Sequence, residues 1–145
     1  MSRTSEIRAL IAASSIGVMP RLVKLCIAGP RDLEVSDGEI HEAVDRLLAT
    51  HNLIPSEVVS GNQFGVDRCG ERWARACGLH VEPFPVTPAE WKKYGKPAGP
   101  MRNGRMADYA DALLAIRHKM SNGTSDMIDK MRQRKKPFLV VEVRR

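Results

Sequence analysis

Short apolar runs that alternate with helical patterns constrain the fold of this chain more than any other feature of its sequence. Five runs have the composition of buried strands, and segments with helical or loop signals separate them. The predicted strands are 22–28, 57–60, 79–84, 112–116 and 138–143. Helices between consecutive strands produce right-handed crossovers and a parallel sheet covered on both faces. The sequence therefore predicts an α/β fold with a doubly wound, mainly parallel five-stranded sheet flanked by helices.

Helix start and stop signals support this alternation. Ser36 is followed three residues later by Glu39, which is the capping-box pattern of a helix N-terminus. Gly78 suits the left-handed backbone that often ends a helix. The predicted helices are one that begins after Ser36 and three over 65–77, 101–110 and 121–134.

Residues 85–99 contain three prolines and two glycines around Trp91 and Tyr94. This composition predicts a long ordered loop rather than a helix or strand. Aromatic side chains in such a loop either cover the core or stack on a ligand base, and the sequence leaves both interpretations open.

A length of 145 residues is typical of one domain that buries its own core. No apolar run approaches the roughly 18–20 residues that cross a bilayer, and the apolar stretch over 9–19 lacks a clean signal-peptide cleavage site. We expect a cytoplasmic protein with an N-terminal extension or short helix over 1–21 and a single domain over 22–145.

The three cysteines, Cys26, Cys69 and Cys77, form no C-x-x-C pair, and their odd number argues against a disulfide framework. Free cysteine is among the most buried residue types, so core packing is the favoured role and metal or redox chemistry the alternative. We predict neither a metal site nor a cofactor.

The net charge of +6 is concentrated near the C-terminus, where residues 130–145 hold seven basic residues and one acidic residue, Glu142. Cations in the last turn of a helix stabilise it through the helix dipole, which explains the cluster without a partner. Binding of nucleic acid is the functional alternative.

Polar and glycine-rich segments follow four of the predicted strands. Ligands of open parallel sheets bind beyond the carboxyl ends of the strands, so these segments are expected to meet at one edge. They are Gly29-Pro30-Arg31-Asp32, Ser60-Gly61-Asn62-Gln63-Phe64-Gly65-Val66-Asp67, Gly99-Pro100-Met101-Arg102-Asn103 and His118-Lys119-Met120-Ser121-Asn122-Gly123-Thr124.

Each segment contains groups suited to a phosphate or a ribose. Gly61 and Gly65 would let the backbone approach a ligand, and the helix that follows offers free N–H groups. Arg31 and Arg102 could donate charge-assisted hydrogen bonds to an anion. Each signal also has a structural explanation, since glycines after strands form turns and Asp67 could cap its own helix.

The convergence of these segments predicts a nucleotide-type ligand. The residues expected to contact it are Gly29, Pro30, Arg31, Asp32, Ser60, Gly61, Asn62, Gly65, Val66, Asp67, Arg102, Asn103, Ser121, Gly123 and Thr124. The carboxylates that could act as acid, base or nucleophile are Asp32, Asp67 and Glu71.

The same motifs, together with Gly123-Thr124-x-x-Met127-Ile128, resemble the YspA-like branch of the SLOG superfamily, which includes DprA and the Lonely Guy phosphoribohydrolases. The resemblance spans residues 23–143. It implies a Rossmann-like fold, a nucleotide or nucleotide-derived ligand and a bacterial or phage origin. With the apolar N-terminal stretch, it also implies a homo-oligomer.

Lonely Guy enzymes carry a Gly-Gly-x-Gly-Thr-x-x-Glu motif whose glutamate serves catalysis. This chain keeps Gly123 and Thr124 but has Met127 at the glutamate position. Asp126 is adjacent, but a helix turns each neighbour by roughly 100°, so we expect it to point elsewhere. Arg117 and Lys119 indicate a more negatively charged ligand.

Three functions follow, in decreasing order of support. The first is binding or sensing of a nucleotide-derived ligand. The second is a nucleotide-processing enzyme. It would act on an N-glycosidic bond, as a phosphoribohydrolase does, or on a phosphate bond. The third is DprA-like binding of nucleic acid. The base, the number of phosphates and the oligomeric state stay open at this stage.

Overall fold

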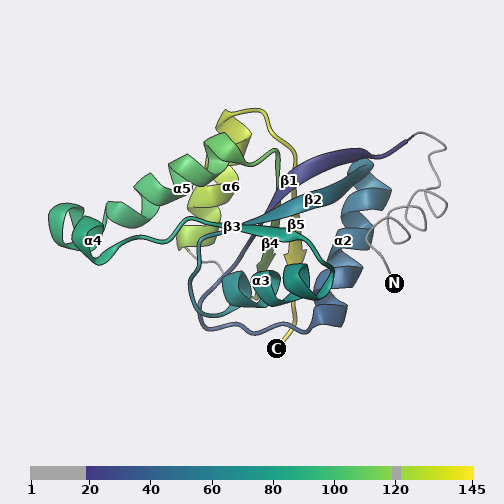
Figure 1. The fold of residues 1–145 in the computed structure, drawn as a ribbon, viewed down its shortest axis with the longest axis horizontal. Helices are drawn as coiled ribbons and strands as arrows, with labels where there is room; N and C mark the ends of the chain where they lie inside the picture. Colours follow the sequence, from purple (N-terminus) through teal and green to yellow (C-terminus); the bar gives the residue numbers. More distant parts are fainter. Residues whose placement is uncertain (1–18, 119–121) are drawn as a thin grey trace.

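The computed structural model describes residues 19–118 and 122–145, and the elements in them alternate between strands and helices (Figure 1). In chain order they are β1 (Arg21–Ala28), α2 (Asp37–His51), β2 (Leu53–Ser60), α3 (Val66–Ala76), β3 (His80–Pro83), α4 (Pro88–Tyr94), α5 (Ala98–Tyr109), β4 (Ala112–Arg117), α6 (Asn122–Gln133) and β5 (Phe138–Glu142).

The five strands form one sheet in the order β3-β2-β1-β4-β5. Every neighbouring pair is parallel, so the predicted doubly wound α/β fold is confirmed. The strand order reverses between β1 and β4, where the chain first builds outward to β3 and then returns to the other side of β1. Such a reversal leaves a crevice beyond the carboxyl ends of the two strands.

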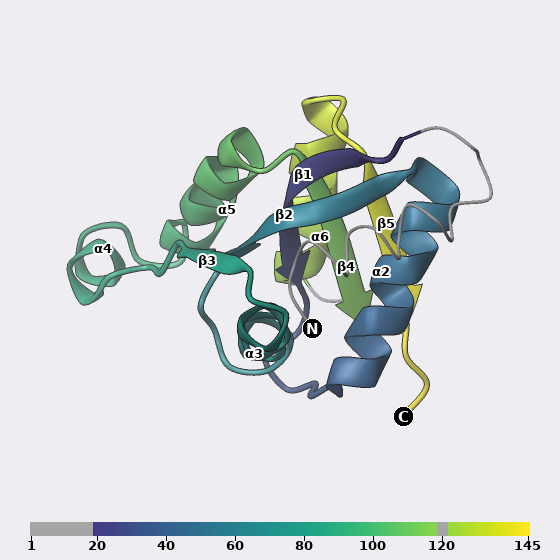
Figure 2. The same cartoon turned by 45° about the vertical axis from the view of Figure 1, so that its right-hand side comes forward.

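Two layers of apolar side chains cover the two faces of the sheet. The helices that carry them lie on either side of the strands (Figure 2). On one face α2 and α3 contribute the buried side chains of Ile40, Leu47 and Trp73. On the other face α5 and α6 contribute Met106 and Met131. Because both faces are covered, the central strands are almost continuously apolar instead of alternating with polar residues.

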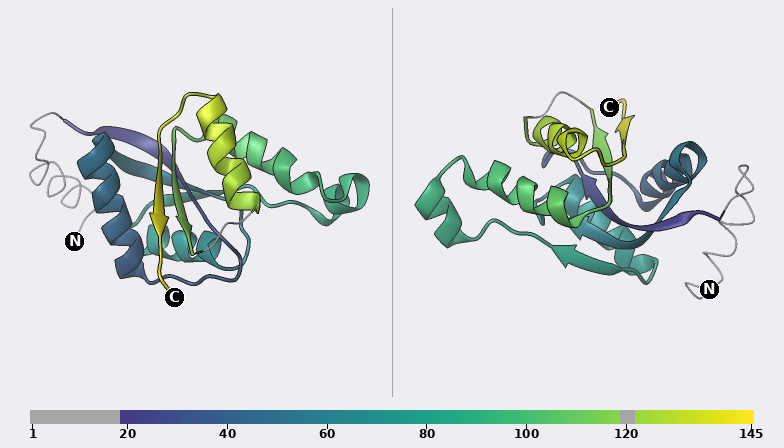
Figure 3. Two further views of the ribbon diagram at one scale, coloured as in Figure 1. Left: turned by 180° about the vertical axis from the view of Figure 1, so that it is seen from behind. Right: turned by 90° about the horizontal axis from the view of Figure 1, so that it is seen from above.

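The prediction of a long loop over 85–99 is wrong in part, because α4 forms within it. Thr87 accepts a hydrogen bond from the Glu90 amide, and the Glu90 carboxylate accepts one from the Thr87 amide. Pro88 follows Thr87 as the first helical residue, where its missing N–H costs nothing. Figure 3 shows α4 at the far end of α5, away from the sheet, and none of its residues is buried.

Two other elements begin earlier than predicted. The helix α5 starts at Ala98 instead of residue 101. The strand β2 starts at Leu53 and includes Pro55, which has no N–H for the sheet. Pro55 pairs with Val23 of β1, and the register of the two strands shifts directly after this pair, between Val23 and Lys24. This irregularity accommodates the proline.

Other local predictions are confirmed. Ser36 and Glu39 form the capping box of α2, and Gly78 has a φ of +72° after the end of α3. Cys26 and Cys69 are buried in the core, and Cys77 is half-buried. No helix in the described ranges combines the length and the apolar character needed to span a bilayer.

Candidate functional site

A cavity of about 610 Å³ opens beyond the carboxyl ends of β1 and β4, where the strand order reverses. Its volume lies within the range of small-molecule sites. It is lined by Ala28, Gly29, Pro30, Arg31, Asp32, Gln63, Asp67, Lys96, Gly99, Pro100, Arg102, Asn103, Met106, His118, Gly123, Thr124, Asp126 and Met127.

Most of the residues predicted to contact a ligand line this cavity. They are Gly29, Pro30, Arg31, Asp32, Asp67, Arg102, Asn103, Gly123 and Thr124. The others within the described residues do not line it, namely Ser60, Gly61, Asn62, Gly65 and Val66. Ser121 lies outside the described residues.

Arg102 is the buried cation of the cavity wall, with 4% of its surface exposed. Its Nε donates to Asn103 Oδ1 at 3.0 Å. Its Nη1 donates to the carbonyl oxygens of Gly61 at 2.7 Å and Phe84 at 3.2 Å. Among the described residues Arg102 forms no ion pair, and its Nη2 has no hydrogen-bond acceptor. A buried guanidinium with two free N–H groups is suited to an anionic ligand.

Asn103 ties α5 to the first turns of α6. Its Nδ2 donates to Asp126 Oδ2 at 3.0 Å and to the Gly123 carbonyl at 3.4 Å. Asp126 also accepts a hydrogen bond from Lys130 at 2.6 Å. A helix turns Asp126 away from the direction of Met127, yet both residues line the cavity. The wall is wide enough to include side chains from more than one direction around α6.

Thr124 and Gly123 form the part of the cavity wall that belongs to the first turn of α6. Thr124 is 3% exposed, and its hydroxyl has no hydrogen-bond partner among the described residues. A Cβ added to Gly123 would meet no atom within 4 Å. The N-terminal turn of a helix also presents N–H groups without intrahelical partners, so this part of the wall favours negative charge.

The segment Ser60–Asp67, called the 60–67 loop below, is held from behind by Glu71 of α3. Glu71 is 2% exposed and accepts hydrogen bonds from Ser60 Oγ at 2.7 Å and Asn62 Nδ2 at 2.8 Å. Arg75 pairs with its other oxygen at 3.3 Å. Glu71, one of the three candidate catalytic carboxylates, does not line the cavity.

The glycines of the 60–67 loop face protein atoms. A Cβ on Gly61 would lie 2.7 Å from Asp67 Oδ2 and 3.0 Å from Arg102 Nη1. Gly65 has a φ of +81°, and a Cβ there would collide with the backbone of Pro30 and Arg31. Gly65 is therefore required by its backbone conformation and by its approach to other backbone atoms, whereas a Cβ at Gly61 would displace the side-chain ends of Asp67 and Arg102.

Asp67 is the buried carboxylate of the cavity, with 5% of its surface exposed. Burial raises its pKa to about 6, although hydrogen bonds from the Gln63 and Gly29 amides and the charge of Arg102 act in the opposite direction. Its Oδ2 accepts from the Gln63 amide at 3.3 Å, so it braces the 60–67 loop instead of capping its own helix, whose N-cap is Gly65.

Further ionisable groups around the cavity are Arg31, Asp32, Lys96 and His118. Arg31 and Lys96 are exposed and form no ion pair within the described part of the chain. His118 Nδ1 is buried and has no hydrogen-bond partner in the structure as described. The predicted ligand contacts include neither Lys96, which lies in the expected loop, nor His118, which begins the segment after the fourth predicted strand.

The basic residues near the C-terminus mostly contact their own chain. Arg134 pairs with Asp108 at 2.7 Å, and Arg145 pairs with Glu39 at 2.6 Å. Lys136 Nζ donates to three carbonyl oxygens at the end of α5, those of Ala107, Asp108 and Ala110. These contacts support the structural explanation of the cluster, since a lysine at the carbonyl end of a helix stabilises its dipole.

Comparison with known proteins gives two partial matches, and no protein-family model matches the chain. The Gene 61 protein of Mycobacterium phage D29 is 42% identical over 72 residues, which cover 46% of this chain and 56% of that protein. DNA processing protein A (DprA) from Streptococcus pneumoniae superposes with a TM-score of 0.47 at 16% identity, over 81% of this chain and 58% of that chain. The chain thus spans little more than half the length of either protein, and its function has to be inferred from the geometry of the cavity.

Proposed function

We propose that the cavity binds a nucleotide or a nucleotide-derived anion. The observation that carries this proposal is Arg102, a buried guanidinium on the cavity wall whose Nη2 has no acceptor among the described residues. Leaving such N–H groups unpaired is costly unless water or a ligand satisfies them. An anionic oxygen is the partner that forms the strongest hydrogen bond with a guanidinium.

The other groups of the wall extend the proposal from an anion to a nucleotide. Thr124 and the first turn of α6 provide a hydroxyl and backbone N–H groups for a second anionic oxygen. Asp32 and Asp126 provide carboxylate oxygens that accept hydrogen bonds from sugar hydroxyls. The resemblance of the motifs to the SLOG superfamily supports the same class of ligand.

Isothermal titration of the purified chain tests this proposal against nucleoside mono- and diphosphates, ADP-ribose and cyclic dinucleotides. We expect at least one of them to bind at tens of micromolar or tighter. Replacing Arg102 by lysine keeps the charge but removes the free Nη2 donors, and it should weaken binding by about 10- to 100-fold. Thr124→Val keeps the side-chain shape and should weaken binding by about 10-fold.

Arg105→Lys is the matched control for Arg102→Lys. Arg105 lies on the same helix, is exposed, pairs with Glu90 at 2.9 Å and does not line the cavity. Its substitution should leave the affinity unchanged. The proposal is wrong if no compound binds at tens of micromolar, or if both arginine variants lose the same affinity.

Asp67 supports an enzyme as the second candidate function. A carboxyl with a pKa of about 6 in a cavity is close to the value that suits general acid or base catalysis near neutral pH. Nucleoside monophosphates incubated with the protein should then release free base that chromatography detects. Asp67→Asn should abolish the release, whereas Glu71→Gln should retain it, because Glu71 does not line the cavity. Unchanged substrates would exclude this candidate for the compounds tried.

A further inference from the structure

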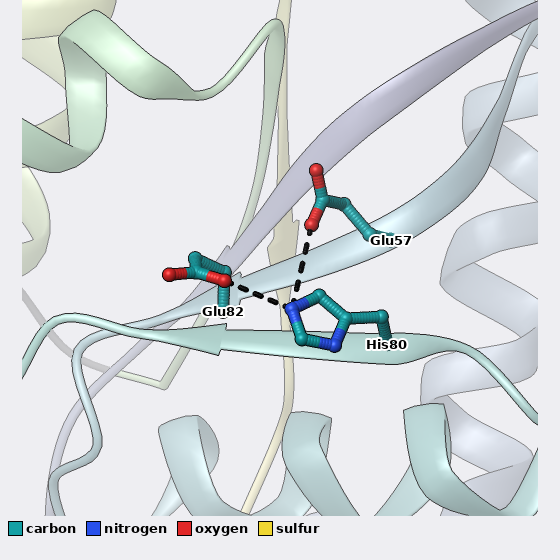
Figure 4. A group of neighbouring side chains, drawn as sticks. All are labelled: Glu57, His80 and Glu82. Carbon is teal, nitrogen blue, oxygen red and sulfur yellow. Dashed lines mark hydrogen bonds and ion pairs between the residues drawn. The ribbon is translucent and has the colours of Figure 1, made fainter.

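We propose that Glu57, His80 and Glu82 bind one divalent transition-metal ion, for which Zn²⁺ is the best match. The three side chains lie on β2 and on β3, the edge strand of the sheet (Figure 4). The site is separate from the cavity, which none of the three residues lines. The inference therefore does not depend on the proposed function.

The strand register brings the three side chains together. Glu57 and His80 are partners across the parallel pair of β2 and β3, so their side chains leave the sheet side by side. Glu82 is two residues after His80 and points to the same face, because side chains alternate along a strand. Val58 and Val81 point to the opposite face and pack in the core with α3.

The distances between the donor atoms suit a small metal ion. His80 Nε2 lies 2.8 Å from Glu82 Oε2 and 4.0 Å from Glu57 Oε2, and all three atoms lie within 4.8 Å of one another. Metal–ligand bonds of about 2.1 Å place the ligands of a tetrahedral zinc ion about 3.4 Å apart. The His80 and Glu82 side chains are 65% and 40% exposed, so both have the freedom to rotate by the small amount required.

Glu57 is the anchored member of the group. Its side chain is only 16% exposed, and its Oε1 accepts a hydrogen bond from Tyr109 Oη at 2.7 Å. This contact leaves Oε2 directed toward His80 (Figure 4). A hydrogen bond to the second oxygen of a ligating carboxylate is a common way in which proteins orient metal ligands.

The local charge favours a cation. Two of the three ligands are carboxylates, those of Glu57 and Glu82. Lys24 lies over the Tyr109 ring, 4.2 Å from its centre, and offsets part of this charge. The two carboxylates would neutralise the charge of a bound dication.

The ligand types select the metal. Carboxylates alone would suit Mg²⁺ or Ca²⁺, whereas an imidazole nitrogen favours Zn²⁺ and neighbouring transition metals. Three protein ligands also leave a position for water, as in zinc sites of the open type. Without a metal, His80 contacts both glutamates directly.

Calorimetric titration of the tag-free chain with Zn²⁺ at pH 7.5 tests the proposal. We expect one ion per chain with a Kd in the micromolar range or tighter. His80→Ala removes the only nitrogen ligand and should weaken binding by at least about 100-fold, and Tyr109→Phe by about 10-fold. Mg²⁺ at the same concentration should not compete.

His51→Ala is the matched control, because His51 is an exposed histidine at the end of α2. It should bind Zn²⁺ as the unmodified chain does. Circular dichroism should show that His80→Ala folds, since His80 is exposed and its loss opens no cavity. The proposal is overturned if the unmodified chain binds no stoichiometric Zn²⁺, if Mg²⁺ competes equally, or if His80→Ala and His51→Ala have the same affinity.

Discussion

The 60–67 loop and the wall formed by α5 and α6 are both polar, yet their hydrogen bonds are used in different ways. In the loop, Ser60 and Asn62 donate to Glu71, and the glycines pack against protein atoms. In the wall, Arg102 and Thr124 keep donors that no described residue satisfies. The wall therefore retains side-chain donors for the proposed ligand, whereas the loop uses the donors of Ser60 and Asn62 within the protein.

Gly61 connects the two regions. Its carbonyl accepts a hydrogen bond from Arg102, and a Cβ at Gly61 would lie between Arg102 and Asp67. The loop thus positions the guanidinium that faces the cavity. We infer that the loop mainly supports the site, with Gln63 and Asp67 as its members on the cavity wall, and that the α5–α6 wall carries most of the contacts with the ligand.

The largest change in stability is expected from Gly65→Ala in the loop. The added Cβ would collide with the Pro30 and Arg31 backbone at a φ of +81°, where only glycine is unstrained. Overpacking and backbone strain together should lower the free energy of unfolding by about 4 kcal/mol. Urea denaturation measures this loss. A variant as stable as the parent would mean that the loop is not packed as described.

Asp67→Asn gives the next effect, and it depends on pH. Burial raises the Asp67 pKa from 3.8 to about 6, so the folded state is disfavoured as the carboxyl ionises. The contribution of the Asp67 carboxyl to the free energy of unfolding is fully present below about pH 4 and is lost as the pH rises through 6. The loss amounts to at most about 3 kcal/mol. Relative to the parent, Asp67→Asn should therefore gain stability between pH 4 and pH 7.5. Parallel stability curves for the two proteins would contradict the buried state of this carboxyl.

Glu71→Gln should have a smaller effect, confined to stability. Its new amide would face the donors of Ser60 and Asn62, at a cost of about 1–2 kcal/mol. Affinity for a nucleotide should change by less than twofold, because Glu71 does not line the cavity. Denaturation and titration of the same sample separate the two readouts. A large loss of affinity in a stable variant would place Glu71 at the ligand.

Gly123→Ala should have the smallest effect on stability, a slight rise in the free energy of unfolding. It should nevertheless weaken ligand binding. A Cβ there meets no atom within 4 Å, and alanine favours a helix by up to about 1 kcal/mol over glycine. The methyl group would instead enter the cavity and weaken ligand binding. If this variant binds as the parent does, the first turn of α6 does not approach the ligand.

The fold and much of the cavity wall follow from sequence patterns because they depend on local rules. The strand and helix alternation determines the parallel sheet, and the carboxyl ends of its strands bring Arg31 and Arg102 to one cavity. The α4 helix was also readable, since Thr87 and Glu90 repeat the capping pattern of Ser36 and Glu39. The prolines of residues 85–99 favoured the loop interpretation. Pro88, however, begins the helix and does not interrupt it.

The distribution of hydrogen bonds could not be predicted, because it depends on contacts between distant residues. Nothing in the sequence pattern around Ser60 indicates that its hydroxyl donates a hydrogen bond to Glu71. Helical geometry predicts a different direction for Asp126 than for position 127, but it does not predict that both residues line the cavity or that Asp126 accepts a hydrogen bond from Asn103. The group of Glu57, His80 and Glu82 depends on the pairing register of two strands, which periodicity alone does not specify.

The most direct test of the account is a map of amide chemical shifts during titration with the nucleotide that binds best in calorimetry. We predict that the largest shifts occur at Asn103, Gly123 and Thr124 of the α5–α6 wall, with smaller shifts at Gly61 and Asn62 of the loop. Saturating shifts confined to the 60–67 loop, with Gly123 and Thr124 unmoved, would contradict the assignment of the ligand contacts to that wall.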